Sequence, residues 1–171
     1  MTEKISWEKS VENAWLAAAI DGEGCILLSK NKARTSYDPR ITITNTDPRF
    51  IAKVSEILYK NDVKFFYSLN LRLEDDVTRR DRIQLTSSGL GTVQKYLLII
   101  EPYLTCKKEQ AQLLLSYIAW RQELGFHKGM FPLEEVREKA TETREELTRM
   151  KFQRFNLQRI QRTASKPLIL E

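Results

Sequence analysis

The chain has 171 residues, 28 of them basic and 23 acidic, which gives a net charge of +5 and a sequence pI of about 9.2. This length suits one domain with an appendage, and two cysteines and one histidine exclude a disulfide framework, a four-thiolate zinc site and a catalytic histidine pair. No apolar run could cross a membrane and the N-terminus is unlike a secretory signal, so we expect an intracellular protein of the cytoplasm, nucleoid or an organelle.

Local patterns predict a helix, two strands and a second helix in the first part of the chain. In chain order, we expect a helix over residues 10–22, a strand over 25–30, a polar loop over 31–39, a strand over 40–44 and a helix that begins at Asp47-Pro48, with Thr46 or Asp47 as its cap. Residues 14–20 are apolar at every position, so the first helix should be covered on all sides.

The same order of elements repeats once and is followed by further helices. We expect strands over residues 67–73 and 82–86, helices over 88–101 and 106–124, and a helical segment beyond Pro132. Short connections make the strands antiparallel, so the predicted class is α+β, an αββαββα core with a four-stranded antiparallel sheet and extra C-terminal helices. Residues 1–125 should form the core, and residues 126–171 a basic helical extension packed on the same domain.

Each predicted strand has an apolar face and a polar face. Apolar positions expected to pack on the helices are Ile41, Ile43, Leu69, Leu71, Ile83 and Leu85. The polar face lacks acids within the predicted strands and carries hydroxyl, amide and guanidinium groups, which bind base edges and phosphates. The expected DNA-binding residues are Ser29, Arg40, Thr42, Thr44, Ser68, Asn70, Arg72, Arg80, Arg82, Gln84 and Thr86. The alternative is an ordinary solvated sheet face.

A second basic feature lies near the C-terminus. Six cations and no acid occur between Glu146 and Glu171, namely Arg149, Lys151, Arg154, Arg159, Arg162 and Lys166. Apolar residues alternate with them, which indicates either a basic amphipathic helix packed on its own domain or a segment beside a phosphate backbone.

Small residues recur along the first helix. Ala14, Ala18 and Gly22 are spaced by four positions and form a smooth stripe on which another helix could pack closely. Such packing would bring the carboxylates at the two helix ends together, and paired carboxylates suit Mg²⁺ and metal-assisted hydrolysis of a phosphodiester. The alternative is an ordinary buried helix closed by glycine.

Residues 16–24 read LAAAIDGEG and resemble the LAGLIDADG motif of the homing endonucleases. Trp15 before the motif, Cys25-Ile26 after it, and the run 41–47 before the second helix fit the same family over roughly residues 10–125. The resemblance implies an intron-encoded, site-specific endonuclease that hydrolyses double-stranded DNA with Mg²⁺, or Mn²⁺ or Ca²⁺ as substitutes. A single motif implies the homodimeric type with a long pseudo-palindromic target.

The resemblance also implies roles for individual residues. Glu23 occupies the metal-binding acidic position, and the carbonyl of Gly22 often contributes to the same site. Asp21 fills the first acidic position, which more often serves structure. Asn45 is expected to order water, and Arg49 to steady the scissile phosphate.

Further implications concern a catalytic lysine and the partner chains. The position of the family's lysine falls on Glu109, so Lys108 or Lys107 is expected to substitute for it. The dimer interface is expected at Ala14, Ala18, Asp21 and Gly22. Expected partners are double-stranded DNA, a second copy and, for an RNA-binding intron maturase on the same fold, intron RNA. A DNA-binding protein that has lost cleavage is the other alternative, although the acid at position 23 favours an enzyme.

Overall fold

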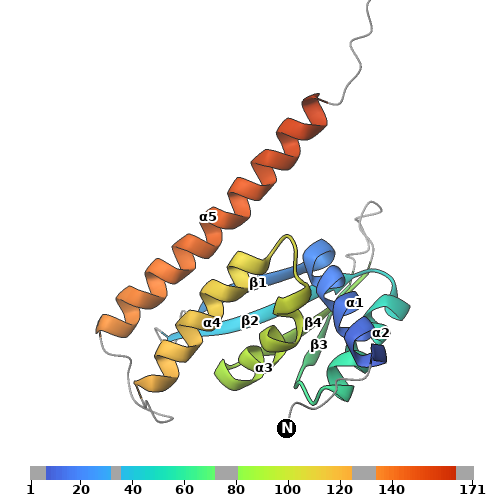
Figure 1. Cartoon of the computed structure of the whole chain (residues 1–171), viewed down its shortest axis with the longest axis horizontal. Helices are drawn as coiled ribbons and strands as arrows, with labels where there is room; N and C mark the ends of the chain where they lie inside the picture. The colour runs from blue at the N-terminus through green and yellow to red at the C-terminus, as the bar shows by residue number, and fades with distance from the viewer. Residues whose placement is uncertain (1–6, 32–35, 72–80, 125–133, 165–171) are drawn as a thin grey trace, which may run out of the picture.

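The computed structural model describes residues 7–31, 36–71, 81–124 and 134–164. The elements in chain order are α1 (Trp7–Glu23), β1 (Gly24–Asn31), β2 (Ser36–Asn45), α2 (Pro48–Lys60), β3 (Phe66–Asn70), β4 (Arg82–Ser88), α3 (Leu90–Ile100), the 3-10 helix η1 (Glu101–Tyr103), α4 (Lys108–Glu123) and α5 (Glu134–Ala164) (Figure 1). This arrangement confirms the predicted α+β class and the repeated helix–strand–strand order. No helix in the described ranges is long and apolar enough to cross a membrane.

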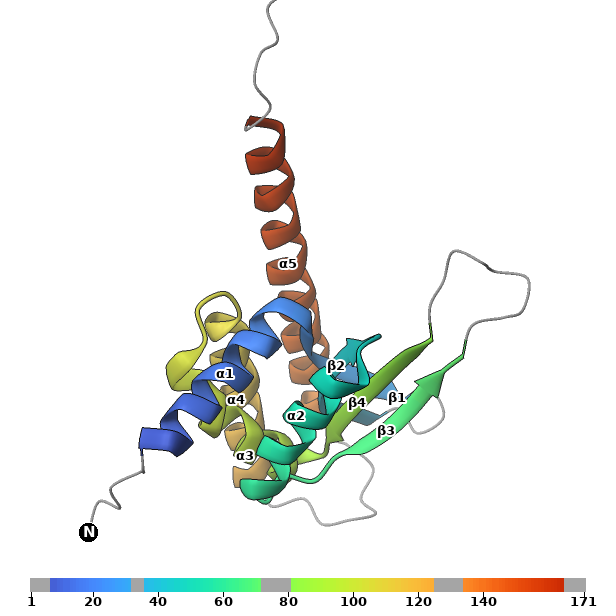
Figure 2. The same cartoon turned by 90° about the vertical axis from the view of Figure 1, so that its right-hand side faces the viewer.

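The four strands form one antiparallel sheet in the order β1-β2-β4-β3. Ile41 and Ile43 of β2 are buried and pair with Ile26 of β1 and Leu85 of β4, which are buried too. Helices α1 to α4 pack against this apolar face, and Figure 2 shows α1, α3 and α4 gathered on one side of the sheet. The side chains that alternate with the buried ones therefore define an opposite, open face.

The second helix shows how local sequence sets an element. Asp47 caps α2 by accepting a hydrogen bond from the backbone N–H of Arg49 at 2.8 Å, and Pro48 opens the helix, as predicted. Buried positions recur at helical spacing, at Ile51, Val54, Ile57 and Leu58. Through this apolar stripe, α2 packs against β2 and β4.

The predicted loop over residues 31–39 is wrong at residues 31 and 36–39, which belong to strands, and residues 32–35 lie outside the described residues. Residues 36–39 belong to β2 and pair with residues 28–31 of β1. Tyr37 packs against the core, its hydroxyl lies 2.8 Å from Thr141 Oγ1, and Lys30 Nζ sits 5.9 Å from the centre of its ring. These contacts extend the hairpin beyond the apolar alternation that is visible in the sequence.

A second correction concerns β3. Leu69 and Leu71 are 60% and 67% exposed, so the prediction that they pack against the helices is wrong. Tyr67, on the same face of the strand, is 53% exposed. The reason lies in helix packing: the helices cover the apolar face of the sheet over β1, β2 and β4, whereas β3 is an edge strand that pairs only with β4.

Helix α5 has two distinct parts. Val136, Ala140 and Leu147 are buried where the first part packs along α4 and β1. The later part extends beyond the rest of the molecule, which Figures 1 and 2 both show. The predicted C-terminal extension is therefore helical over residues 134–164, and the two parts of this helix have different surroundings.

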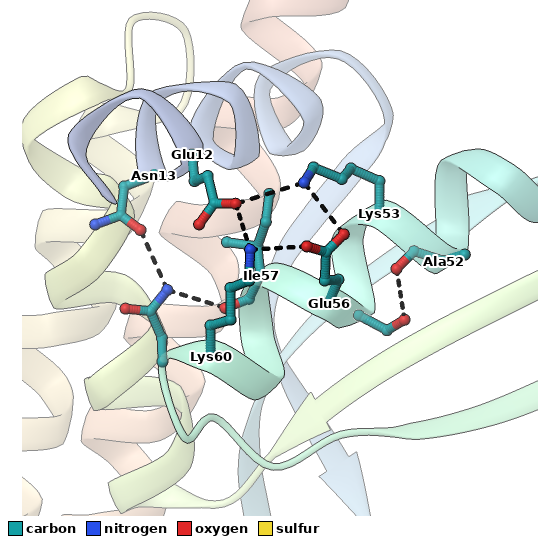
Figure 3. A network of polar contacts seen from close by, with 9 residues as sticks. Glu12, Asn13, Ala52, Lys53, Glu56, Ile57 and Lys60 are labelled. Carbon is teal, nitrogen blue, oxygen red and sulfur yellow. Dashed lines mark hydrogen bonds and ion pairs between the residues drawn. The ribbon is translucent and has the colours of Figure 1, made fainter. Parts of the chain in front are cut away.

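Polar contacts hold α1 on α2 (Figure 3). Glu12 accepts hydrogen bonds from Lys60 at 2.7 Å and Lys53 at 3.5 Å, and Glu56 pairs with the same two lysines. The hydrogen bond from Lys60 is the main cause that lowers the pKa of Glu12. The network is largely solvent-exposed, so it orients the two helices more than it stabilises them.

A buried amide pair lies beside this network. Asn13 Oδ1 accepts a hydrogen bond from Asn61 Nδ2 at 3.2 Å, and the same nitrogen donates to the carbonyl of Ile57 at 2.9 Å. Because an unsatisfied buried amide is costly, this pair fixes the relative position of α1 and α2. The motif helix is thereby positioned against the sheet.

We expect Tyr96→Phe to stabilise the protein. The Tyr96 hydroxyl is fully buried and has no hydrogen-bond partner among the described residues. Removing an unsatisfied hydroxyl should raise the free energy of unfolding by about 1 kcal/mol, or the melting temperature by about 2–4 °C. Tyr117→Phe is the matched control, because Tyr117 is buried but hydrogen-bonded to Arg121, and this variant should lose stability. A loss of stability in both variants would contradict the prediction.

Candidate active site and nucleic-acid interface

Glu23 lies at the junction between the motif helix and the sheet. Helix α1 ends at Glu23 and β1 begins at Gly24 with no intervening loop. A Cβ at Gly24 would lie 2.8 Å from the Cα and the carbonyl oxygen of Ile20, so this sharp junction requires glycine. The Glu23 side chain is exposed there, and no described residue forms a hydrogen bond or ion pair with its carboxylate. It is therefore open to an external ligand.

The Asp21 carboxylate, unlike that of Glu23, is bound by other residues of the chain. Its carboxylate accepts hydrogen bonds from the backbone N–H groups of Thr105, Cys106 and Lys107 at 2.8, 3.0 and 2.8 Å. These groups lie just before α4, where a carboxylate also interacts favourably with the helix dipole. Asp21 therefore ties the end of α1 to the start of α4, and its share in a dimer interface stays a prediction.

The two candidate lysines have different surroundings. Lys107 Nζ donates to the carbonyls of Ile20 and Asp21 at 2.7 and 2.6 Å, so its charge lies at the C-terminal end of the motif helix. Lys108 Nζ lies 3.8 Å from Glu101 Oε1, and Glu109 is exposed. The sequence did not decide which of the two lysines substitutes for the family's lysine. Of the two, Lys107 is the one that contacts the motif in the structure.

The end of β2 presents a second polar group. Asn45 follows Ile43 by two residues, and Ile43 pairs with Gly24, so Asn45 lies at the same end of the sheet as the motif junction. Its Oδ1 accepts from the backbone N–H of Asp47 at 2.8 Å. The Asn45 side chain is thereby oriented by the turn that precedes α2.

The Arg49 side chain forms an ion pair with Asp47, a residue that was predicted from the sequence only as a helix cap. Its Nε and Nη2 atoms lie 3.1 and 2.9 Å from the two carboxylate oxygens of Asp47. Hydrogen bonds from the Arg49 side chain and backbone lower the pKa of Asp47, and the same pairing raises the pKa of Arg49. Because the Arg49 side chain is 90% exposed, a phosphate could compete for this guanidinium. The spacing of an aspartate two residues before the arginine is the signal that could have identified the pair.

Most of the predicted DNA-binding residues lie on the open sheet face. The pairing register places on this face Ser29, Arg40, Thr42, Thr44, Ser68, Asn70, Arg82 and Gln84. Thr86 is only 5% exposed because this short side chain lies on an inner strand between Thr42 and Phe66. Arg72 and Arg80 lie outside the described residues.

The expectation that this face lacks acids is wrong. Asp38 lies within β2 on the open face, and its Oδ2 is 3.2 Å from Arg40 Nε. The acid was missed because β2 begins earlier than the alternation in the sequence predicts. Arg40 is therefore partly neutralised, whereas Gln84 has no such competing partner among the described residues.

Within one chain the motif helix is covered on one side only, so the full coverage expected from its sequence stays a prediction that requires a partner. Leu16, Ala17 and Ile20 are fully buried, yet a stripe on the other side of α1 is exposed. We call it the α1 stripe; it comprises Trp7, Val11, Trp15, Ala18 and Gly22, with Ala14 partly exposed beside it. A Cβ placed at Gly22 would meet nothing within 4 Å. One chain alone thus leaves the small-residue face of the motif helix uncovered.

One chain also supplies few ligands for a metal ion. No group of three or more acidic, histidine or cysteine side chains gathers in the ranges that the structure describes. Glu23 offers one free carboxylate, while the carbonyls of Ile20 and Asp21 are occupied by Lys107. The oxygen donors are the type that Mg²⁺ prefers, and the set would be completed by donors from outside this chain.

Comparison with known proteins shows which fold this is. No family model and no curated protein sequence matches the chain. Among solved structures, the homing endonuclease I-CvuI in complex with its target superposes with a TM-score of 0.53 at 18% identity, over 84% of this chain and 98% of that one. The LAGLIDADG meganuclease I-AabMI bound to uncleaved DNA gives 0.54 at 14% identity, over 77% of this chain and 43% of that one. The chain therefore has the fold of the LAGLIDADG homing endonucleases, as its motif predicts.

Proposed function

We propose that this protein is a site-specific endonuclease that cleaves double-stranded DNA, of the homing type. The observation that carries the proposal is the position of Glu23, exposed and without a partner among the described residues, where the motif helix meets a sheet with an open polar face. I-CvuI and I-AabMI, which share the fold, are homing nucleases that were crystallised with DNA. A duplex lying on the open face would bring its backbone close to this carboxylate.

The same reasoning supports a homodimer. Each chain has one motif carboxylate, and cutting both strands calls for two. The α1 stripe, with Ala18 and Gly22 toward its C-terminal end, allows a second α1 helix to approach closely there. A two-fold dimer would cover this stripe, bring two Glu23 carboxylates together and match a pseudo-palindromic target.

We propose Mg²⁺ as the cofactor, with Mn²⁺ or Ca²⁺ able to occupy the same site. When bound, such an ion polarises the scissile phosphate and makes a bound water more acidic. Glu23 and the carbonyl of Gly22 would hold it. Lys107 places a positive charge at the same helix end, Asn45 would orient a water molecule, and Arg49 would bind a phosphate oxygen.

A cleavage assay on a library of long DNA duplexes tests the proposal. The purified chain with Mg²⁺ should produce double-strand breaks at a discrete site, and EDTA should prevent them. Binding to one duplex without cleavage would indicate a DNA-binding protein that has lost cleavage. Preference for structured RNA over every duplex would instead favour the maturase alternative.

We expect Gln84→Ala to relax sequence preference. Gln84 lies on the open face of β4, opposite Thr44 and Ser68, where an amide can read a base edge in the major groove. Loss of this contact should reduce discrimination at one or two base pairs in each half-site by about 1–3 kcal/mol, measured by binding to single-substitution target variants. Gln112→Ala on α4 is the matched control and should change nothing. Uniform weakening across all target variants would show that Gln84 contacts only the backbone.

A further inference from the structure

A groove with a basic rim runs between α5 and the edge strand β1. It encloses about 480 Å³ and is lined by residues 25–30 of β1 and by Arg144, Leu147, Thr148, Lys151 and Phe152 of α5. Leu147 is buried at its floor, whereas Arg144, Thr148 and Lys151 are exposed. We propose that these three residues, the α5 basic row, bind the phosphate backbone of double-stranded DNA independently of its sequence.

The cations of the groove differ from the other cations of α5. Arg137, Lys139 and Arg149 each form an ion pair with a glutamate three residues away on the same helix. Arg144 and Lys151 form no ion pair within the described part of the chain, and no acid lines the groove. The unpaired positive charges of Arg144 and Lys151 therefore lie in the groove beside β1. The negative charge of a phosphate backbone would complement them.

The direction of α5 relates the row to the candidate active site. Thr141 contacts Tyr37, which pairs with Lys30 near the end of β1, whereas Phe152 shares the groove with Cys25 near its start. Helix α5 therefore runs antiparallel to β1, toward the junction at Glu23. The α5 basic row lies along the edge of the sheet at which the motif helix ends.

The sequence continues this pattern where α5 leaves the body of the molecule. Two further cations, Arg159 and Arg162, follow in the sequence of α5, and no acid occurs in α5 after Glu146. The later part of α5 extends past the rest of the protein (Figures 1 and 2).

The inference rests on the proposed function, because it assumes that DNA lies on the open face. Cys25, Leu27 and Ser29 alternate with buried residues of β1 and also line the groove, so the groove borders that face. Base reading would then belong to the sheet, and the α5 basic row would add affinity without adding specificity.

The test compares two double variants of the full chain. Arg144→Gln with Lys151→Gln removes two charges from the row. Lys139→Gln with Arg149→Gln removes two charges from the same helix at ion-paired positions. Binding to labelled duplexes of unrelated sequence is measured without divalent ions, from about 0.05 to 0.3 M salt. Circular dichroism verifies that both variants are folded.

The row variant should flatten the slope of log affinity against log salt by about 0.9 for each lost contact, or about 1.8 in total, and weaken binding roughly tenfold near 0.2 M salt. The control should keep the wild-type slope, and the loss should be equal for all duplexes. Equal salt slopes in the two variants would overturn the inference. A change of oligomeric state in the row variant alone would also overturn it, as would a larger loss of affinity for structured RNA than for duplex DNA. If the wild-type chain binds and cleaves DNA but the row variant keeps its slope, only this inference fails; if the wild-type chain binds no duplex, the proposed function fails with it.

Discussion

Glu23→Gln is expected to abolish DNA cleavage while leaving DNA binding nearly intact. Glutamine keeps the size of the side chain but removes the charge that would hold a divalent ion, and metal catalysis contributes several kcal/mol to such reactions. The cleavage rate should therefore fall by at least about a thousandfold. Binding, measured separately in Ca²⁺, should persist because it depends on the open sheet face.

Glu109→Gln provides the matched control for this substitution. Glu109 is an exposed glutamate in the first turn of α4 and makes no contact with the motif in the described structure. The control should cleave at the wild-type rate. Near wild-type cleavage by the Glu23 variant would remove this carboxylate from the active site, and loss of binding together with cleavage would show that it has a structural role.

Ala18→Leu is expected to weaken the dimer. Ala18 lies between Ala14 and Gly22 on the exposed side of α1, where close approach of two helices depends on small side chains. The larger side chain should cost about 1–3 kcal/mol by overpacking, which corresponds to roughly a 5- to 150-fold rise in the dimer dissociation constant. Sedimentation over a range of concentrations measures this change, and double-strand cleavage should decline with the dimer population.

The control for this variant is Ala119→Leu. Ala119 is an exposed alanine on α4, and the α1 stripe is on a different helix. It receives the same added volume and should leave association unchanged. A wild-type chain that sediments as a monomer at micromolar concentration and still cuts both strands would refute the dimer model itself.

Local sequence was sufficient for several features of the fold. The cap at Asp47, the alternation at Ile41 and Ile43 and the helical spacing in α2 each depend on residues close together in the chain. The motif at residues 16–24 was equally readable, because a helix and the turn that ends it form a continuous segment. These features identified the fold class and made Glu23 the first candidate for the active site.

Other features depended on which elements become neighbours. The contact of Lys107 with the motif follows from how Asp21 ties α1 to the start of α4. The exposure of Leu69 follows from the position of β3 at the edge of the sheet, and the Asp38 ion pair on the open face from the true start of β2.

The sequence by itself therefore determined the order of the elements and the motif, because periodicity, capping and turn formation act over a few residues. The tertiary structure alone decided which sides of those elements are covered. The α1 stripe shows the difference: the sequence predicts that Trp15 and Ala18 are covered, yet packing in one chain covers only the side that carries Leu16 and Ile20. Burial depends on contacts between distant segments, and a periodic pattern does not specify which partner makes them.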